Sequence, residues 1–566
     1  MAHADRAHEP PWLGAGKGAD LRSGGKGARA ARAEDETDDP GCSCGGRAGT
    51  AHRALVGTFR GRRPDHRSVS SRRRARGLTT ELDSEHATGP RRSAGGSAPG
   101  EQVRRWPFWP TLAAIAAVGL ALRVLFVFGS GRTFEFLSDA FYFHLGGQAL
   151  ADGAGFVDPY RYAAGELVPA AGHPPLYQVY LAVPSLFGLD SVRSHQLAST
   201  LLGATMVVVV GLVGRRLAGR RAGLVAGAVA AVYPNLWIND AMLMSESMYA
   251  LTIALVLWAA YGAWQRADTS GAAVLGAAVA LAALTRAEAV LLLVLLVVPL
   301  FGLMKAQALR RKVVLVGTAL AVALAVMAPW VGYNLIRFDR PVLLSSGAGH
   351  VLAAANCDQT YSGNLLGYWS QDCLFGEPAQ GDHSVWEAAA RAEGIDYMTT
   401  HLGEVPVVVL ARVGRLWELY RPLQGVELSA YAEHRGLWPT RLALVSYYVL
   451  LLIGAYGLVV LWRRKVTVVP MVALAAMVTF TAAVSFGITR YRVPVDVGLA
   501  VLAGVAVDQW LRNRATDAAY STASSDSSPA TASTPTSRVA NSALSRATCS
   551  ARDRVRSWRR DSSKEK

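Results

Sequence analysis

Apolar residues occur in long blocks through the middle of the chain, between about residues 106 and 511. Each block has roughly the 20 residues that a helix needs to cross a bilayer. We therefore predict an all-α polytopic membrane protein, a bundle of about ten transmembrane helices. The predicted spans are residues 107–129, 193–214, 222–238, 247–264, 271–286, 287–304, 313–331, 441–462, 466–486 and 493–510. A composition of 51% hydrophobic and 18% charged residues argues against a set of soluble domains.

Most of the positive charge lies in the two ends of the chain. The first 105 residues contain 20 Lys/Arg and 13 Asp/Glu, net +7, and residues 511–566 contain 11 and 5, net +6, of a total of +16. Both ends are poor in large apolar residues, which predicts disordered basic tails at 1–105 and 512–566 around a membrane domain at 106–511. The basic run at 72–76 could bind nucleic acid or anionic lipid. A tail that fixes membrane topology is favoured, so no nucleic-acid partner is expected.

The basic connections predict the direction of the spans. Lys and Arg gather at 215–221, 305–312 and 463–465, which fall on the cytoplasmic side if both tails are cytoplasmic. The two longer connections, 130–192 and 332–440, carry two Arg against six acidic residues and seven Arg against twelve. They are predicted to be extracytoplasmic loops with helices that rest on the membrane, including the proline-containing apolar segment 173–189.

Two cysteines fall in the second outer loop. Cys357 and Cys373 enclose a 17-residue ring, and the outside of a cell is an oxidising setting. We expect a disulfide that contributes about 3 kcal/mol on the chain-entropy model. Two free thiols are the alternative.

The first outer loop contains a candidate catalytic acid. Ser138 is a good helix N-cap, so Asp139 should lie in the first turn, with Tyr142 and Phe143 on its face. A carboxylate at the membrane surface can accept a proton or orient a hydroxyl. The alternative is an acid that merely complements the helix dipole.

Other ionisable residues reach the same outer level from distant parts of the chain. Intramembrane charges are costly and often functional. Each one alone could be a snorkelling or capping residue, but their convergence favours a site, and arginine forks suit a phosphate or pyrophosphate. These residues are Arg123, Asp240, Glu246, Arg286, Glu288, Arg490 and Arg492.

Four stretches together resemble the GT-C superfamily of membrane glycosyltransferases: 138–142 with 153–156, 172–177, 284–288, and 328–330 with 333–334. The resemblance is to the polyprenyl-phosphate-sugar users, which include protein O-mannosyltransferases and aminoarabinose transferases of lipid A. It covers about 105–511. The loop from Cys357 to Cys373, with Gly367-Tyr368-Trp369, looks like that of an actinobacterial branch.

The resemblance implies an inverting sugar transfer outside the membrane, with Asp139 as the catalytic base. Relatives often have a second acid where Ala140 stands and a basic residue where Tyr142 stands, so Asp139 acts alone or with Glu246. His173 corresponds to a lysine that grips the donor phosphate in aminoarabinose transferases. The implied binding residues for donor phosphate or substrate are His173, Tyr142, Arg286, Glu288, Arg490 and Arg492.

The implied partners are a polyprenyl-phosphate-linked sugar, membrane lipid, and a cell-envelope glycan, glycolipid or protein as acceptor. No His/Asp cluster demands a metal, although a divalent cation beside Asp139 stays open. The expected location is the plasma membrane, with the active site outside. A transporter or lipid flippase is the alternative, weakened by the lack of a clear inverted repeat, and a non-catalytic scaffold that binds polyprenyl lipids is a third possibility.

Overall fold

The computed structural model describes residues 107–129, 138–374 and 381–525. Within these ranges the chain forms helices and their connections, and one isolated antiparallel bridge joins Val157 to Pro169. The described residues all belong to a compact unit, Ala98–Lys566. The other unit, Met1–Ser97, lies outside the described residues, as do the predicted tail at 1–105 and its basic run. The predicted all-α class is confirmed.

Among the described residues, six helices are long and apolar enough to cross a membrane, and the number is seven if one bent pair counts as a single span. The bent pair is α6 (Arg220–Val232) and α7 (Pro234–Ala241), which meet at 47°. Tyr233 between them is extended because it precedes a proline. The six long helices are α1 (Phe108–Gly129), α5 (Val192–Ala218), α8 (Glu246–Arg266), α11 (Leu309–Arg337), α17 (Leu437–Arg463) and α19 (Val493–Ser525).

The three remaining predicted spans are helical but shorter than a full crossing. The fifth and sixth are separated at Arg286, where the backbone is extended. The helix α19 continues to Ser525, beyond the predicted boundary at 511. The shorter elements are α9 (Thr269–Ala283), the run of η1 (Ala287–Leu291), η2 (Leu293–Val297) and α10 (Val298–Gly302), and α18 (Val469–Val484).

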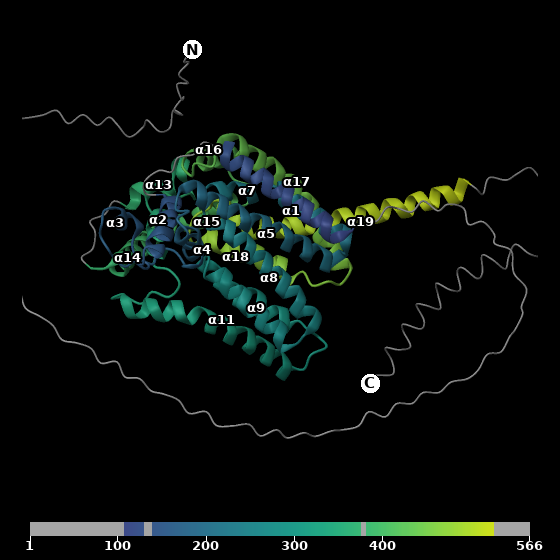
Figure 1. The fold of residues 1–566 in the computed structure, drawn as a ribbon, viewed down its shortest axis with the longest axis horizontal. Coiled ribbons are helices and arrows are strands. Elements are labelled where there is room, and N and C mark those ends of the chain that lie inside the picture. The colour runs from purple at the N-terminus through teal and green to yellow at the C-terminus, as the bar shows by residue number, and fades with distance from the viewer. Residues whose placement is uncertain (1–106, 130–137, 375–380, 526–566) are drawn as a thin grey trace, which may run out of the picture. The chain divides into compact units, whose positions relative to one another are not determined.

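The two long connections fold into short helices. Figure 1 places α2, α3, α13 and α14 at the same end of the bundle. The segment 173–189 forms one short helix with Pro184 inside it, as predicted. The first connection contains α2 (Asp139–Ala151), α3 (Pro159–Ala163) and α4 (Leu176–Leu186). The second contains α12 (Ala348–Ala355), α13 (Asp358–Tyr361), η3 (Gly363–Leu365), η4 (Gln371–Leu374), α14 (His383–Thr400), α15 (Val405–Leu416) and α16 (Pro422–Tyr431).

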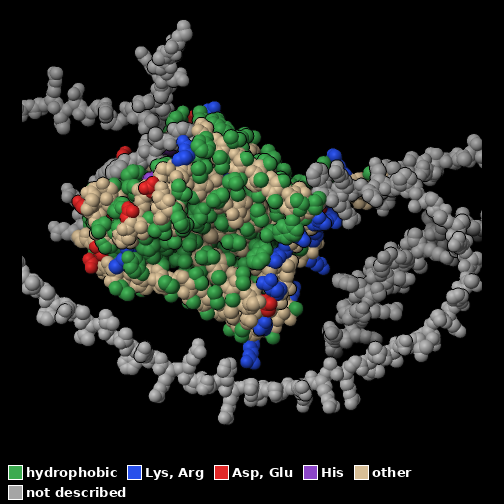
Figure 2. All heavy atoms as spheres, in the orientation of Figure 1, with side chains coloured by type: hydrophobic (Ala, Val, Ile, Leu, Met, Phe, Trp, Pro, Cys, Tyr) green, Lys and Arg blue, Asp and Glu red, His purple; other side chains and the backbone are tan. Residues whose placement is uncertain are grey.

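The surface of the bundle is apolar between two charged ends. Figure 2 shows hydrophobic side chains over the middle, blue Lys and Arg at the right, and red acidic side chains at the left. Large apolar side chains such as Leu125, Leu324 and Leu452 are exposed on α1, α11 and α17. An apolar surface of this extent suits contact with lipid tails.

The predicted disulfide is present, because Cys357 and Cys373 are joined. It closes a segment of α13, η3 and η4 in the second connection. We call residues 357–373 the disulfide loop.

A histidine–carboxylate pair joins α12 to α14. His350 donates from Nδ1 to Glu387, whose other carboxylate oxygen accepts from the His350 backbone N–H at 3.0 Å. The hydrogen bond to Glu387 raises the pKa of His350 above its ordinary value. The neighbouring ring of His383 stacks at 6.2 Å, and burial lowers the pKa of His383.

This pair predicts a pH-dependent stability. A raised pKa in the folded state stabilises the protein below the unfolded histidine pKa of about 6.5, and that contribution is lost as pH rises through the folded value. We expect the difference in melting temperature between wild type and His350→Gln to shrink between about pH 6 and pH 8. Thermal unfolding in detergent measures it, and a difference that grows with pH would contradict the sign.

Candidate active site

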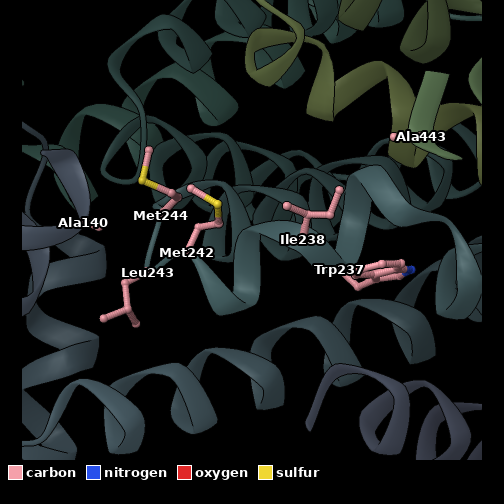
Figure 3. Packing of buried hydrophobic residues seen from close by; sticks show 7 residues of the cluster. All are labelled: Ala140, Trp237, Ile238, Met242, Leu243, Met244 and Ala443. Carbon is pink, nitrogen blue, oxygen red and sulfur yellow. The ribbon is translucent and has the colours of Figure 1, made fainter. Parts of the chain in front are cut away.

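Asp139 is the first residue of α2, as predicted, and Ser138 caps the helix by accepting from the backbone N–H of Phe141 at 3.3 Å. The next residue, Ala140, belongs to a buried apolar cluster with Met242, Leu243 and Met244, which lie between α7 and α8 (Figure 3). This packing brings the start of α2 next to the start of α8. Ser245 precedes α8, but its side chain makes no capping hydrogen bond.

Two cationic or potentially cationic side chains flank the Asp139 carboxylate. Arg490, in η5 (Thr489–Arg492), donates from both Nη1 and Nη2 to Oδ2, at 3.2 and 3.1 Å. The Nε2 atom of His173 lies 3.6 Å from Oδ1. The side chain of Asp139 is 38% exposed and that of Arg490 is 15% exposed. A carboxylate that can be reached from solvent is therefore held beside a largely covered guanidinium.

The neighbours of Asp139 decide its protonation state. Burial alone would raise its pKa, but the adjacent His173 side chain and the charges of Arg490 and Arg286 outweigh the effect of burial. The pKa of Asp139 therefore lies below the ordinary aspartate value. Asp139 is ionised at neutral pH and can accept a proton.

Glu246 lies deeper in the same cluster. Its side chain is fully buried, and Oε1 accepts from Arg286 Nη1 at 2.8 Å and lies 3.6 Å from Arg490 Nε. Arg286 also donates from Nε to Glu288 at 2.7 Å. Glu246 thus lies between two arginines, and the structure brings both together with Asp139, His173 and Glu288 in what we call the charged cluster.

The aromatic residues of α2 surround His173. Tyr142 is buried, and its ring lies 4.8 Å from the His173 ring, as does that of Phe143. Burial and the charge of Asp158 raise the pKa of Tyr142 to about 12. Tyr142 is therefore neutral at physiological pH and restricts the orientation of His173.

Sequence reasoning missed Glu433, and it did not place Tyr368 next to the charged residues. Glu433 Oε2 lies 3.6 Å from Arg490 Nε, and the Tyr368 hydroxyl donates to Glu433 Oε1 at 3.2 Å. The run Glu433-His434-Arg435 shortly before the span at 441–462 could have pointed to the first, since the same signal singled out Arg490. Tyr368 belongs to the Gly367-Tyr368-Trp369 run of the resemblance, but nothing in the sequence paired it with an acid.

The structure does not bring Arg492 into the charged cluster. Its side chain is 1% exposed and lies 3.3 Å from Asp496 and 3.8 Å from Glu418. The ring of Tyr447 lies 3.5 Å from its guanidinium carbon. The two arginines of η5 therefore face different surroundings.

Arg123 and Asp240 also lie apart from that cluster, in contact with each other. Arg123 Nε is 2.8 Å from Asp240 Oδ2, and neither side chain is more than 1% exposed. Gly203 on α5 provides the space, because a Cβ there would lie 2.3 Å from Asp240 and 2.4 Å from Arg123. This pair is a buried structural contact between α1 and α7.

Among the residues that the structure describes, no group of three or more His, Cys, Asp and Glu side chains could hold a metal ion. The carboxylates of the charged cluster are instead paired with arginine. A carboxylate already shared with a guanidinium is a poor metal ligand, because it would have to give up that pairing.

Together, the fold and the charged cluster define a multi-pass α-helical membrane protein with an ionic site near one end. Residues 172–333 match the family described as dolichyl-phosphate-mannose-protein mannosyltransferase. The match confirms the predicted resemblance over that segment, which is less than half of the chain. His173, Glu246, Arg286 and Glu288 lie inside the segment.

Several solved structures are similar to this chain. The oligosaccharyltransferase AglB of Archaeoglobus fulgidus, in complex with an inhibitory peptide and a dolichol-phosphate, has 15% identity and a TM-score of 0.45, over 77% of this chain and 53% of that one. ArnT of Cupriavidus metallidurans, bound to undecaprenyl phosphate, has 16% identity and a TM-score of 0.34, over 71% and 78%. This chain spans about half the length of the archaeal enzymes. A comparison with curated protein sequences finds no match.

Proposed function

We propose that this protein transfers a sugar, a hexose or a pentose, from a polyprenyl-phosphate donor to a hydroxyl of an extracytoplasmic acceptor, with inversion at the anomeric carbon. The observation that supports this best is the contact of Asp139 with Arg490 and His173. It combines an ionised base for the acceptor with groups that can meet a phosphate.

In this proposal, Arg490, His173 and Arg286 hold the donor phosphate, with Glu246 and Glu288 orienting Arg286. The acceptor oxygen attacks the anomeric carbon from the face opposite the phosphate and passes its proton to Asp139. The bond from the anomeric carbon to the phosphate oxygen breaks, and its electron pair leaves with the polyprenyl phosphate. The two guanidinium groups offset the charge that develops on this leaving group. We assign Tyr142 to the orientation of His173.

Donor binding also adjusts the base. Both Nη atoms of Arg490 donate to Asp139. A phosphate that accepts hydrogen bonds from the same Nη atoms therefore weakens the contact between Arg490 and Asp139. The proton affinity of Asp139 then rises when the donor is in place.

This exchange of Arg490 predicts that kcat/KM and kcat lose activity at different pH values on the acidic side of their pH profiles. The pH profile of kcat/KM reports the free enzyme, and that of kcat reports the enzyme with substrate bound. The free-enzyme limb should lie at low pH, because the pKa of Asp139 is depressed, and activity is lost as pH falls through it. We expect the kcat limb at higher pH. Coincident limbs would contradict the exchange of Arg490 between carboxylate and phosphate.

The proposed orientation puts both termini in the cytoplasm of a cell whose plasma membrane carries the protein, with basic tails at 1–105 and 512–566 and the charged cluster outside. The positive-inside pattern and the disulfide support it. After reduction of intact cells, we expect a membrane-impermeant thiol reagent to label Cys357 and Cys373. If the reagent labels these cysteines only in disrupted cells, the loop is cytoplasmic and the proposed orientation is wrong.

The acceptor is a cell-envelope glycan, a glycolipid or a protein, and the loop type favours an actinobacterial enzyme that uses mannose or arabinose. The test uses full-length protein in proteoliposomes with radiolabelled polyprenyl-phosphate sugars. A new glycosidic product identifies an enzyme. Movement of unchanged solute or lipid would identify a transporter or flippase instead, and donor binding without either would identify a scaffold.

A further inference from the structure

The disulfide loop reaches the charged cluster through Tyr368. This side chain is 4% exposed, and its hydroxyl donates to Oε1 of Glu433 at 3.2 Å. The other carboxylate oxygen of Glu433 lies 3.6 Å from Nε of Arg490, whose Nη2 lies 3.1 Å from Asp139. An unbroken series of polar contacts therefore runs from the disulfide loop to Asp139.

The backbone of the disulfide loop is fixed next to Tyr368. Arg415 of α15, which is 4% exposed, donates to the carbonyls of Leu366 and Asn364 at 2.7 and 2.8 Å. The backbone N–H of Gly487 donates to the carbonyl of Gly367 at 2.9 Å. Gly487 lies just before η5, so the loop is bonded to the segment that carries Arg490.

Two glycines make this close approach possible. Gly367 has φ +75°, and a Cβ there would lie 2.7 Å from the backbone nitrogen of Arg412. A Cβ on Gly487 would lie 2.1 Å from the carbonyl oxygen of Arg412. The loop, α15 and the start of η5 therefore pack backbone against backbone, and the position of Tyr368 relative to Arg490 is set by this packing.

We infer that Tyr368 and Glu433 are positioning residues that set how tightly Arg490 holds Asp139. Glu433 and Glu246 face Nε of the guanidinium whose Nη atoms hold Asp139, so these acids attract Arg490 from different sides. The Tyr368 hydroxyl satisfies one oxygen of Glu433 and limits its attraction for Arg490. The inference rests on the proposed function, in which Arg490 also meets the donor phosphate. In this inference the disulfide loop helps to position Arg490 in the active site.

The test is Tyr368→Phe. Removing the hydroxyl leaves one buried oxygen of Glu433 without its donor, and an unsatisfied buried polar atom is costly, so Arg490 should move from Asp139 toward Glu433. A displacement of about 1 Å in a positioning group can cost up to roughly 100-fold in rate. We expect kcat to fall by roughly 10- to 100-fold, with the KM of the acceptor unchanged.

Tyr361→Phe is the matched control. Tyr361 lies in the same loop, is 6% exposed, and donates to Asn356 at 2.8 Å. Both variants lose one buried hydroxyl contact, so a merely structural role would lower melting temperature and kcat equally in the two. We expect only Tyr368→Phe to lose kcat. Adding Glu433→Gln to it should restore most of the rate, because a neutral amide attracts Arg490 less than a carboxylate does.

A second measurement does not need activity. Melting temperatures of Asp139→Asn combined with each tyrosine variant form two double-mutant cycles. We expect non-additive shifts with Tyr368→Phe and additive shifts with Tyr361→Phe. Additive shifts in both cycles, or equal kcat in the two tyrosine variants, would overturn the inference. If the shifts are non-additive but the protein transfers no sugar, the coupling between Tyr368 and Asp139 stands and the proposed function is wrong.

Discussion

Asp139→Asn is expected to lower the rate of sugar transfer by roughly 10²–10⁴-fold, the usual contribution of a general base. The fold should persist, because the amide is nearly isosteric and Ser138 still caps α2. The lost interaction of a carboxylate with the helix dipole costs only about 0.3–1 kcal/mol. Arg490 keeps Glu246 and Glu433 as partners. Purified variants are compared by melting temperature, donor binding and transfer rate.

The matched control is Asp152→Asn. Asp152 caps the other end of α2 and accepts a hydrogen bond from Tyr162, away from the charged cluster. It should retain wild-type turnover. Wild-type turnover in a folded Asp139→Asn variant would remove Asp139 as the base. Glu246, the second predicted catalytic acid, is buried and paired with Arg286, so it would have to be released from that contact before it could act.

Arg123→Met is expected to lower the free energy of unfolding by about 3–5 kcal/mol, the usual cost of leaving one partner of a buried ion pair alone. Asp240 would stay buried beside an apolar side chain, and it packs closely against the backbone of Gly203. The double variant Arg123→Met with Asp240→Leu should recover much of this loss, because no unpaired charge remains. Melting temperature and denaturant titration in detergent measure both.

The control for this prediction is Arg161→Met, which breaks the exposed pair with Glu166. Exposed ion pairs contribute about 0–1 kcal/mol, so little change is expected. A loss in Arg123→Met no larger than this would mean that water or lipid headgroups reach Asp240. The buried pair would then belong to a solvated site rather than to the core of the bundle.

The positions of the helices could be read from the chain because membrane insertion is a local property. An apolar block of sufficient length satisfies its own backbone hydrogen bonds as a helix in lipid. All ten predicted spans contain helix, and two of the three that are shorter than a full crossing are separated by a local feature. At Arg286 the chain adopts an extended backbone between two short apolar stretches, which divides them.

Two features near the site could also be predicted from neighbouring residues in the sequence. The Ser138–Asp139 helix start follows from capping chemistry, and the Cys357–Cys373 bond follows from loop length and compartment. The sequence also indicated that acids and arginines gather at one end of the bundle. It did not indicate their partners.

Those partners were decided by the tertiary structure. Asp139 and Arg490 lie 351 positions apart, and their contact depends on how α2 packs against the turn before α8. Arg490 and Arg492 look equivalent in sequence, yet a tight 3-10 turn directs one toward Asp139 and the other toward Asp496. Helical periodicity states which residues share a face of one helix. Which faces meet, and so which charges neutralise one another, depends on packing among segments distant in the chain, and that is why Glu433 and Tyr368 emerged only from the fold.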